Sequence, residues 1–232
     1  IHGINIGATA KLHEAGIEPD WVIGTSIGAI NAALIAGNAP ERRLARLEEF
    51  WGIVEHSPVL DAVAAVPWLG RALPNWTALT GGIAGFFRPN PLAFLGLHVP
   101  LAPEAAGYYS TRPLEATLEE LVDFERLAGG APRITVGAAN VRSSEMTYFD
   151  NRKMPLTARH IMASGALPPA FPPIRIEDEL YWDGGILSNT PVEAVFDDNP
   201  RRNSLIFAVH IWNPIGPEPE SIWQVMGRQK DI

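Results

Sequence analysis

The hydrophobic pattern of residues 1–55 predicts a helix, a short strand and two further helices. Residues 8–15 are compatible with a helix that a glycine ends, and residues 20–23 form a short apolar strand. The next helix is predicted at residues 26–37, and it should be buried because nearly all of its positions are apolar. Pro40 begins a charged amphipathic helix, whose apolar positions include Leu44, Leu47 and Phe50.

Helices and strands alternate again from residue 111 onwards. Pro113 stands at the first position of a predicted helix that reaches Leu127, and Thr157 caps a later helix. Strands are predicted at residues 133–141, 146–149, 180–182 and 204–212, of which the last has the clearest pattern of a central strand. Because several of these strands are apolar on both faces, the alternation predicts an α/β fold with a central, largely parallel sheet.

The segment between these two regions has a different composition. Residues 56–103 hold three formal charges, on Asp61, Arg71 and Arg88, together with seven prolines. Such a density of proline prevents long regular elements, so we expect short helices and loops. The segment is also rich in aromatic residues that need apolar surroundings, namely Trp68, Trp76, Phe86, Phe87 and Phe94.

Composition limits the class of protein further. The chain has 232 residues, of which 47% are hydrophobic and 19% charged, a balance that predicts one folded domain over residues 1–232. Its net charge of −8 argues against nucleic acid as a partner. The absence of cysteine excludes disulfides and thiolate chemistry and is compatible with a reducing compartment.

The sequence has neither a candidate membrane span nor a signal peptide. Every apolar stretch is interrupted before it reaches the roughly 18 residues that a spanning helix needs. The chain begins without methionine and ends within an unfinished charged stretch, so we expect it to be the interior part of a longer protein. No histidines and carboxylates stand at metal-ligand spacing, and neither a metal nor a cofactor is expected.

The strongest local signal is the sequence Gly24-Thr25-Ser26-Ile27-Gly28, a G-x-S-x-G motif between the apolar strand and the buried helix. A serine at such a sharp strand-to-helix turn has a strained backbone, and we expect both glycines because side chains there would collide with neighbouring backbone. The turn would present the hydroxyl at the positive end of the helix, where developing negative charge is favoured. The motif therefore indicates a nucleophile, the alternative being a serine cap between two packing glycines.

A nucleophilic serine needs a base, and the sequence offers two kinds. His160 and His210 could complete a Ser-His-acid triad, but one lies in a predicted helix and the other inside a predicted strand, where structural roles are expected. Asp183 ends a strand and is followed by Gly184 and Gly185, which allow close approach to another backbone. An Asp-Gly-Gly sequence taken alone is more often a turn than a base.

These motifs together resemble the patatin-like phospholipase family. The residues that carry the likeness are 24–29 and 183–191, with supporting matches at 12–17, 162–168 and 171–173. The resemblance covers most of residues 1–55 and 110–212. It implies a patatin-like three-layer sandwich and a lipid acyl hydrolase with a Ser-Asp dyad, in which Ser26 is the nucleophile and Asp183 the general base. It further implies motif roles for Gly3, Gly24, Ile27, Gly28, Gly184 and Gly185.

The start of the chain departs from the family pattern. The family opens with the glycine-rich sequence G-G-G-x-[R/K]-G, whose backbone N–H groups form the oxyanion hole after the first strand. Here the chain opens with Ile1-His2-Gly3, in which Gly3 matches the last glycine and His2 the basic position. The resemblance therefore implies that the first strand and most oxyanion donors lie outside this sequence. The N–H groups of Gly3 and Ile27 are the candidates that remain.

The family resemblance also suggests a role for the unusual middle segment. A hydrolase of aggregated lipid needs an apolar entry, so residues 56–110 are predicted to form an apolar cap or lid. Its aromatic side chains would line the acyl path or enter a membrane interface, as we expect for Trp68, Trp76, Phe86 and Phe87. The alternative is that this segment packs against a partner subunit or a further part of the protein.

We therefore expect a serine acyl hydrolase that cleaves ester bonds of phospholipids or other acyl lipids. Two alternatives remain at this stage: a non-catalytic lipid-binding or regulatory domain on the same fold, and an acyltransferase that passes the acyl group to an alcohol. We expect a cytoplasmic location with peripheral membrane contact. The sequence predicts neither the headgroup and acyl chain preference nor the oligomeric state.

Overall fold

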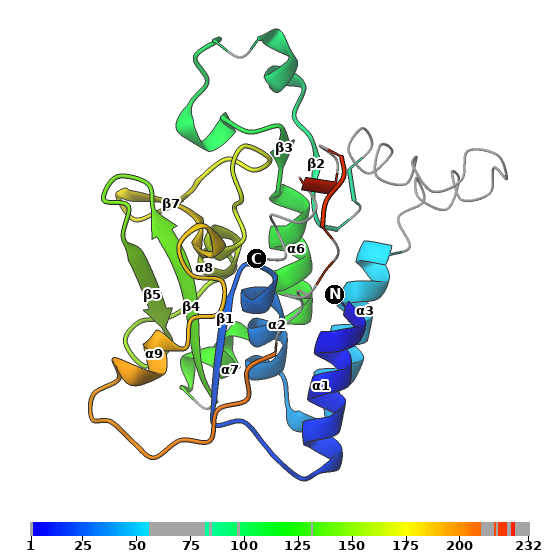
Figure 1. Cartoon of the computed structure of the whole chain (residues 1–232), viewed down its shortest axis with the longest axis vertical. Helices are drawn as coiled ribbons and strands as arrows, with labels where there is room; N and C mark the ends of the chain where they lie inside the picture. Colours follow the sequence, from blue (N-terminus) through cyan, green and yellow to red (C-terminus); the bar gives the residue numbers. More distant parts are fainter. Residues whose placement is uncertain are drawn as a thin grey trace, which may run out of the picture.

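A computed structural model describes residues 2–55, 82–83, 85–96, 98–130, 132–209, 216, 218–221 and 224–225. Its helices and strands are interspersed along the chain (Figure 1). They are α1 (His2–Glu14), β1 (Trp21–Thr25), α2 (Ile27–Ala36), α3 (Pro40–Glu55), β2 (Arg88–Pro89), η1 (Pro91–Leu95), η2 (Pro103–Ala105), β3 (Tyr109–Ser110), α6 (Arg112–Leu121), α7 (Phe124–Ala128), β4 (Arg133–Asn140), β5 (Met146–Asp150), α8 (Ala158–Ser164), β6 (Ile174–Ile176), β7 (Glu179–Asp183), η3 (Gly184–Ile186) and α9 (Glu193–Phe196).

The main sheet is mixed and is organised around β4. Strand β1 runs parallel to β4, whereas β5 and β7 pair with β4 in antiparallel orientation and β6 continues from β7. The predicted α/β fold is confirmed, but the parallel character is limited, among the described strands, to the β1–β4 pair. Antiparallel neighbours arise because β5 returns from β4 by a tight turn and β6 and β7 form a hairpin.

Strands β1 and β7 occupy the same edge of β4, one after the other. Strand β1 pairs with residues 133–137 of β4, and β7 pairs with residues 138–140. Strand β5 pairs with residues 135–139, so it takes the opposite edge along the stretch where both other strands end. Since β1 and β7 run in opposite directions, their carboxyl ends meet beside two consecutive residues of β4, Gly137 and Ala138.

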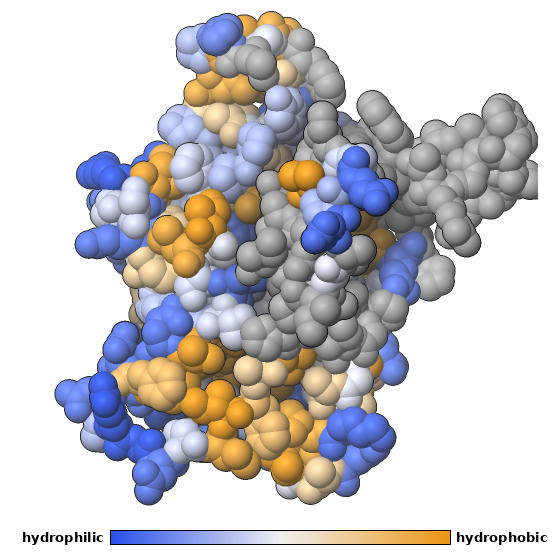
Figure 2. All heavy atoms as spheres, in the orientation of Figure 1, coloured by the Kyte–Doolittle hydropathy of each residue, from blue (hydrophilic) through white to orange (hydrophobic). Residues whose placement is uncertain are grey.

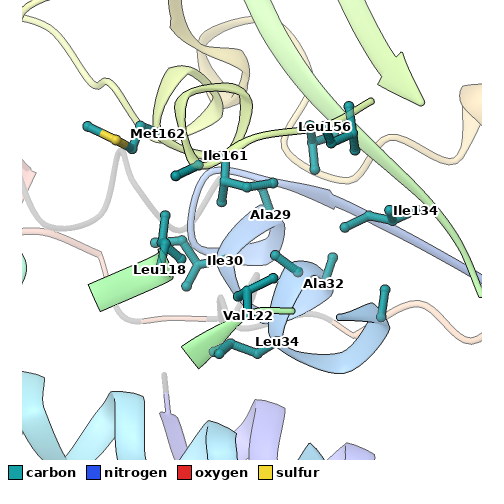
Figure 3. Packing of buried hydrophobic residues seen from close by; sticks show 14 of the residues in the cluster. Ala29, Ile30, Ala32, Leu34, Leu118, Val122, Ile134, Leu156, Ile161 and Met162 are labelled. Atoms are coloured by element: carbon teal, nitrogen blue, oxygen red, sulfur yellow. The ribbon is translucent and has the colours of Figure 1, made fainter. Parts of the chain in front are cut away.

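The hydrophobic core lies between the sheet and the helices of one face. Helices α2 and α8 pack against β4 and against each other, with α3 and α6 behind them. Helix α2 is buried along most of its length, as its apolar sequence predicts. Figure 3 shows side chains of α2, α6, β4 and α8 meeting in this core, among them Ile30, Leu118, Ile134 and Ile161.

The opposite side of the sheet carries a polar cluster that fixes the segment after β7. The buried Arg133 pairs with Asp150 at 2.6 Å and with Asp198 at 2.9 Å, and its guanidinium lies 3.7 Å from the ring centroid of Trp21. The Arg133 guanidinium helps to hold the pKa of Asp150 below its usual value, although burial alone would raise that pKa. Through Asp198, this cluster ties the end of the segment that begins at Asp183 to the sheet.

Two predicted elements differ from the structure. The helix predicted from Pro113 to Leu127 is divided into α6 and α7, because Val122 is extended and Asp123 begins a new helix by accepting a hydrogen bond from the N–H of Arg126. The N–H of Asp123 donates a hydrogen bond to the carbonyl of Gly37, the residue that caps the carboxyl end of α2. This contact with a distant residue interrupts a helix that the local apolar pattern would continue.

The strand predicted at residues 204–212 is wrong over the part that the structure describes. Residues 204–209 have no regular secondary structure, and Leu205 is 81% exposed. An apolar run forms a strand only when the edge of a neighbouring strand supplies hydrogen-bond partners. Among the described residues, β1 pairs with β4 and not with residues 204–209. Residues 210–212, including His210, lie outside the described residues.

Residues 85–96 and 98–110 form short elements, as the proline density predicts. Strands β2 and β3 pair in antiparallel orientation and carry a projection of residues 90–96 and 98–107, which extends beyond the rest of the described domain at the top of Figure 1. The side chain of Asn90 closes its base by donating to the carbonyls of Ala105 and Gly107. Trp68 and Trp76 lie outside the described residues. None of the described helices is long and apolar enough to cross a membrane.

Candidate active site

The meeting of β1 and β7 on β4 brings Ser26 and Asp183 together. Thr25, the last residue of β1, is paired with Gly137, and Asp183, the last residue of β7, is paired with Ala138. Ser26 therefore follows directly on a strand end that faces the strand end carrying Asp183. The hydroxyl of Ser26 donates a hydrogen bond to Oδ2 of Asp183 at 2.6 Å, although 157 positions separate the two residues in the chain.

The backbone of Ser26 adopts the conformation expected of a sharp strand-to-helix turn. Its φ of 58° and ψ of −127° lie in a region that residues other than glycine rarely occupy, at a cost of about 1–3 kcal/mol. Gly24 permits the turn, because a Cβ atom there would stand 2.1 Å from the carbonyl oxygen of Gly28. The prediction that Gly24 avoids a backbone collision is thus confirmed.

The same explanation is wrong for Gly28. Apart from its chain neighbours and the backbone of its own helix, a Cβ atom at Gly28 would meet nothing within 4 Å, so the residue borders open space. Gly28 lines the groove that contains Ser26. The missing side chain therefore leaves open space in the groove that contains Ser26.

Asp183 is held in one orientation and is almost fully removed from solvent. The residue is 3% exposed, and its Oδ1 accepts a hydrogen bond of 2.7 Å from the N–H of Gly185. Burial raises the pKa of Asp183, while the hydrogen bonds from Ser26 and Gly185 partly offset that rise. A raised pKa makes the ionised carboxylate a stronger base than an exposed aspartate. Gly184 is required for the close fit, since a Cβ atom there would stand 2.5 Å from the carbonyl oxygen of Gly137.

The amino end of α2 supplies backbone donors beside Ser26. The first hydrogen bonds within α2 run from the N–H groups of Ala29 and Ile30 to the carbonyl of Ser26. The N–H groups of Ile27 and Gly28 precede these bonds, and both residues line the groove at Ser26. Gly3 lies in the first turn of α1, and its contribution to an oxyanion hole stays a prediction.

His160, the described one of the two histidines considered as a base, has a structural role. His160 lies in α8, where its Nδ1 accepts a hydrogen bond from the N–H of Thr157 and its ring packs edge-on against Phe149. Burial lowers the pKa of His160, which favours the neutral ring. Within the described part of the chain, the hydrogen-bond partner of the Ser26 hydroxyl is the Asp183 carboxylate.

A groove of about 1520 Å³ extends from Ser26 and Asp183 along the outer edge of β1. Its walls are formed by α1 and the loop after it, β1, α2, the start of α3, the loop after α8 and the segments 189–195 and 202–209, and they are mostly apolar. Figure 2 shows apolar residues gathered across the lower part of the face on which segment 204–209 runs in Figure 1. The apolar side chains that line the groove include Ile27, Ile35, Leu167, Val192, Val195 and Phe207.

Phe86 and Phe87 of the predicted cap do not line this groove. Phe86 and Phe87 form a cluster with Tyr109 and Phe171, and Phe86 also contacts Phe50 of the core at a centroid distance of 6.4 Å. A substrate contact for Phe86 and Phe87 stays a prediction, as it does for Trp68 and Trp76. No group of three or more histidine, aspartate or glutamate side chains among the described residues is arranged to hold a metal ion.

Sequence reasoning did not identify Ser164 and Tyr148, which hold segments of this site in place. Ser164 accepts a hydrogen bond from the N–H of Ser26 and donates one to the carbonyl of Gly137, where β1 and β7 meet. Tyr148 donates a hydrogen bond of 2.5 Å to Glu193 and so fastens the segment after Asp183 to β5. The sequence signal for Ser164 was a serine at the end of a short, apolar helix. Only the fold shows that its hydroxyl joins Ser26 to Gly137.

The chain is similar to a known protein family. A family model described as "Patatin-like phospholipase" matches residues 3–196. No curated protein sequence matches the chain significantly. Seven chains of solved structures match, and one of them belongs to the crystal structure of VipD from Legionella pneumophila. That structure is 18% identical, with a TM-score of 0.43, and the alignment covers 82% of this chain and 45% of the VipD chain.

Alanine substitutions at the two glycines of the turn, Gly24 and Gly28, should have opposite effects on stability. Gly24→Ala should lower the free energy of unfolding by at least about 2 kcal/mol, because the added methyl group overlaps a backbone carbonyl. Gly28→Ala should leave the melting temperature unchanged or raise it, because alanine favours helix and meets open space. The same Gly28 variant should lose activity. Thermal unfolding and an ester hydrolysis assay measure both effects, and a strongly destabilised Gly28→Ala would show that its surroundings are not open.

Proposed function

The chain belongs to the patatin-like phospholipase family, and from this premise we propose that it hydrolyses carboxylic esters of acyl lipids with Ser26 and Asp183. The family as such implies lipid acyl hydrolase activity. The observation that carries the assignment to these two residues is the 2.6 Å hydrogen bond from the Ser26 hydroxyl to the Asp183 carboxylate, at the amino end of a buried helix. A nucleophile, a base and a source of positive potential thus lie within one small region.

The first half of the proposed reaction forms an acyl-enzyme. Oγ of Ser26 attacks the ester carbonyl carbon while its proton passes to Oδ2 of Asp183, to which it is already directed. The carbonyl oxygen becomes an oxyanion, which the N–H groups at the start of α2 stabilise. When the intermediate collapses, the bond to the leaving oxygen breaks and Asp183 returns the proton to that oxygen. The products of this half are an alcohol and an acyl ester of Ser26.

The second half releases the fatty acid and restores the site. A water molecule attacks the acyl ester and gives one proton to Asp183, and collapse of the new intermediate returns this proton to Oγ of Ser26. Asp183 therefore exchanges a proton twice in each cycle. Its burial suits this work, because a carboxylate with a raised pKa accepts a proton from a hydroxyl more readily than an ordinary one does.

The groove beside Ser26 supports an acyl substrate. Its mostly apolar walls extend away from the hydroxyl, so a hydrocarbon chain can lie along them while its ester carbonyl stands at Ser26. Acyl transfer to an alcohol would begin with the same acyl-enzyme. Adding an alcohol such as glycerol and identifying the products distinguishes the two reactions, because a hydrolase yields free fatty acid and a transferase yields the new ester.

We further propose that the projection of residues 90–96 and 98–107 contacts the lipid surface. Residues 91–102 contain no aspartate, glutamate, lysine or arginine, and Leu92, Leu95 and Val99 are 47%, 63% and 42% exposed. The charged side chains begin at its base, where Arg175 donates a 2.5 Å hydrogen bond to Glu104. This arrangement, an apolar end above a polar base, is typical of segments that enter the interfacial region of a bilayer.

Ser26→Ala should abolish ester hydrolysis and leave the fold intact. The methyl group of alanine fits the turn, and loss of a nucleophile costs several orders of magnitude in kcat. A fluorophosphonate probe should label Ser26 in the unchanged protein and fail to label the variant. Ser143→Ala, which alters an exposed turn, serves as the control. If Ser26→Ala kept activity within about tenfold of the control, or if the protein neither hydrolysed esters nor reacted with the probe, this proposal would be wrong.

Asp183→Asn should remove activity nearly as completely while preserving or raising the melting temperature at pH 7. The pKa of Asp183 is raised in the folded state, so the stability it contributes is present at low pH and is lost as pH rises through that pKa. At pH 7 the buried charge is a cost, which asparagine removes. For the unchanged enzyme, kcat/KM should fall as the pH drops through the raised pKa, above the range of an ordinary aspartate near 4. A fully active Asp183→Asn variant would exclude Asp183 as the base.

Leu95→Asp should weaken hydrolysis of phospholipid vesicles more than hydrolysis of a soluble short-chain ester. Burial of a leucine side chain is worth about 1.5–3 kcal/mol, so binding to neutral vesicles should fall by about tenfold or more. Phe196→Asp is the control, since Phe196 is similarly exposed on α9. Because residues 91–102 carry no formal charge, added salt should not release the protein from vesicles. Equal losses on both substrates would instead indicate general damage to the enzyme.

A further inference from the structure

The carboxyl end of α8 contacts the backbone of both reacting residues. Ser164, the last residue of α8, accepts hydrogen bonds from the N–H of Ser26 at its carbonyl oxygen, at 3.1 Å, and at its Oγ, at 3.0 Å. Two residues later, the carbonyl of Ala166 accepts a hydrogen bond of 3.0 Å from the N–H of Asp183. One short stretch of chain thus holds the backbone of the serine and the backbone of its base.

The direction of the hydrogen bonds at the Ser164 hydroxyl follows from the groups around it. A backbone N–H can only donate and a backbone carbonyl can only accept. Oγ of Ser164 must therefore accept from Ser26 and give its single proton to the carbonyl of Gly137, at 2.5 Å. The side chain has 0% exposure, so water does not compete for either bond. The hydroxyl joins β4 to the turn in one defined orientation.

The place of this hydroxyl explains what it does for the turn. Gly137 is the position of β4 opposite the end of β1, just before β7 takes over the same edge. Ser26 has left β1, so its N–H points away from that strand pairing and its positive φ needs support from elsewhere. Ser164 supplies two acceptors for the N–H and fixes one of them to the sheet.

We propose that Ser164 is a positioning residue, whose hydroxyl fixes the Ser26 turn so that Oγ of Ser26 stays directed at Asp183. The proposal rests on the proposed function of Ser26. Ser164 does not touch the reacting atoms and acts through the backbone of Ser26 alone. Its loss should therefore reduce the rate of attack by the serine and leave binding of the acyl chain in the groove unchanged.

Three variants at this position separate hydrogen bonding from packing. Ser164→Ala removes the hydroxyl. Ser164→Cys replaces it with a thiol, which forms only weak hydrogen bonds, and Ser164→Thr keeps a hydroxyl on Cβ. Ile161→Val, in the same helix, is the matched control, because it alters a fully buried side chain that has no hydrogen bond to the site. Each variant is assayed in the full chain for kcat, for KM with a short-chain ester and for the rate of labelling by a fluorophosphonate.

Ser164→Ala should lower kcat and the labelling rate together by about 10- to 100-fold, with KM changed less than about twofold. Ser164→Cys should fall between Ser164→Ala and the unchanged protein, and Ser164→Thr should recover much of the labelling rate. Ile161→Val should keep both rates even where its melting temperature falls as far as that of Ser164→Ala. A Ser164→Ala protein that keeps its labelling rate, or a loss shared equally by Ile161→Val, would overturn the proposal. If Ser164→Ala does not fold, the Ser164→Cys and Ser164→Thr variants decide by the same measure.

Hydrogen exchange at the Ser26 amide separates failure of this inference from failure of the proposed function. If the unchanged protein neither hydrolyses esters nor reacts with the probe, the proposed function fails. The Ser26 amide should still exchange faster in Ser164→Ala than in Ile161→Val. Equal exchange in the two variants would show that Ser164 does not hold the turn, whatever the protein catalyses.

Discussion

The arrangement of this domain depends on the pairing of two strands along one edge of β4. Strand β1 arrives from one direction and β7 from the other, and their last residues stand opposite Gly137 and Ala138. Because the hydrogen-bond register of each strand with β4 is set independently, the distance between the two strand ends is determined by a third strand that carries neither reacting group. The hydrogen bond between Ser26 and Asp183 is a consequence of that shared register.

This junction has little space for side chains. Cβ atoms added at Gly24, Gly137 or Gly184 would each approach another atom to 2.5 Å or less. Backbone segments therefore come close enough for the Ser164 hydroxyl to bridge β4 and the turn. The same closeness excludes water from Asp183 and so raises its pKa. The fold thus sets both the position and the pKa of Asp183, the proposed base.

Much of the local structure could be predicted from the sequence, because it depends on neighbouring residues. The helices of residues 1–55, the turn at Ser26 and the strand ending at Asp183 follow from apolar periodicity, glycine placement and motif. The break at Asp123, the unpaired course of residues 204–209 and the contact of Ser164 with Ser26 could not be predicted. Each depends on a partner far away in the chain. The break at Asp123 depends on Gly37, the course of residues 204–209 depends on whether a strand edge lies beside them, and the contact of Ser164 depends on Ser26.

The cluster of Arg133, Asp150 and Asp198 has a consequence for how this site could change in evolution. The chain from Asp183 to Asp198 is anchored at both ends, by strand pairing at one and by the buried guanidinium at the other. Between these anchors lie Val192 and Val195, which face the groove. Lengthening a closed loop costs little, about 0.6 kcal/mol for each doubling, so this stretch can be replaced or extended while Asp183 keeps its place. Under the proposed function, selection for new acyl groups would act there without moving Ser26 or Asp183.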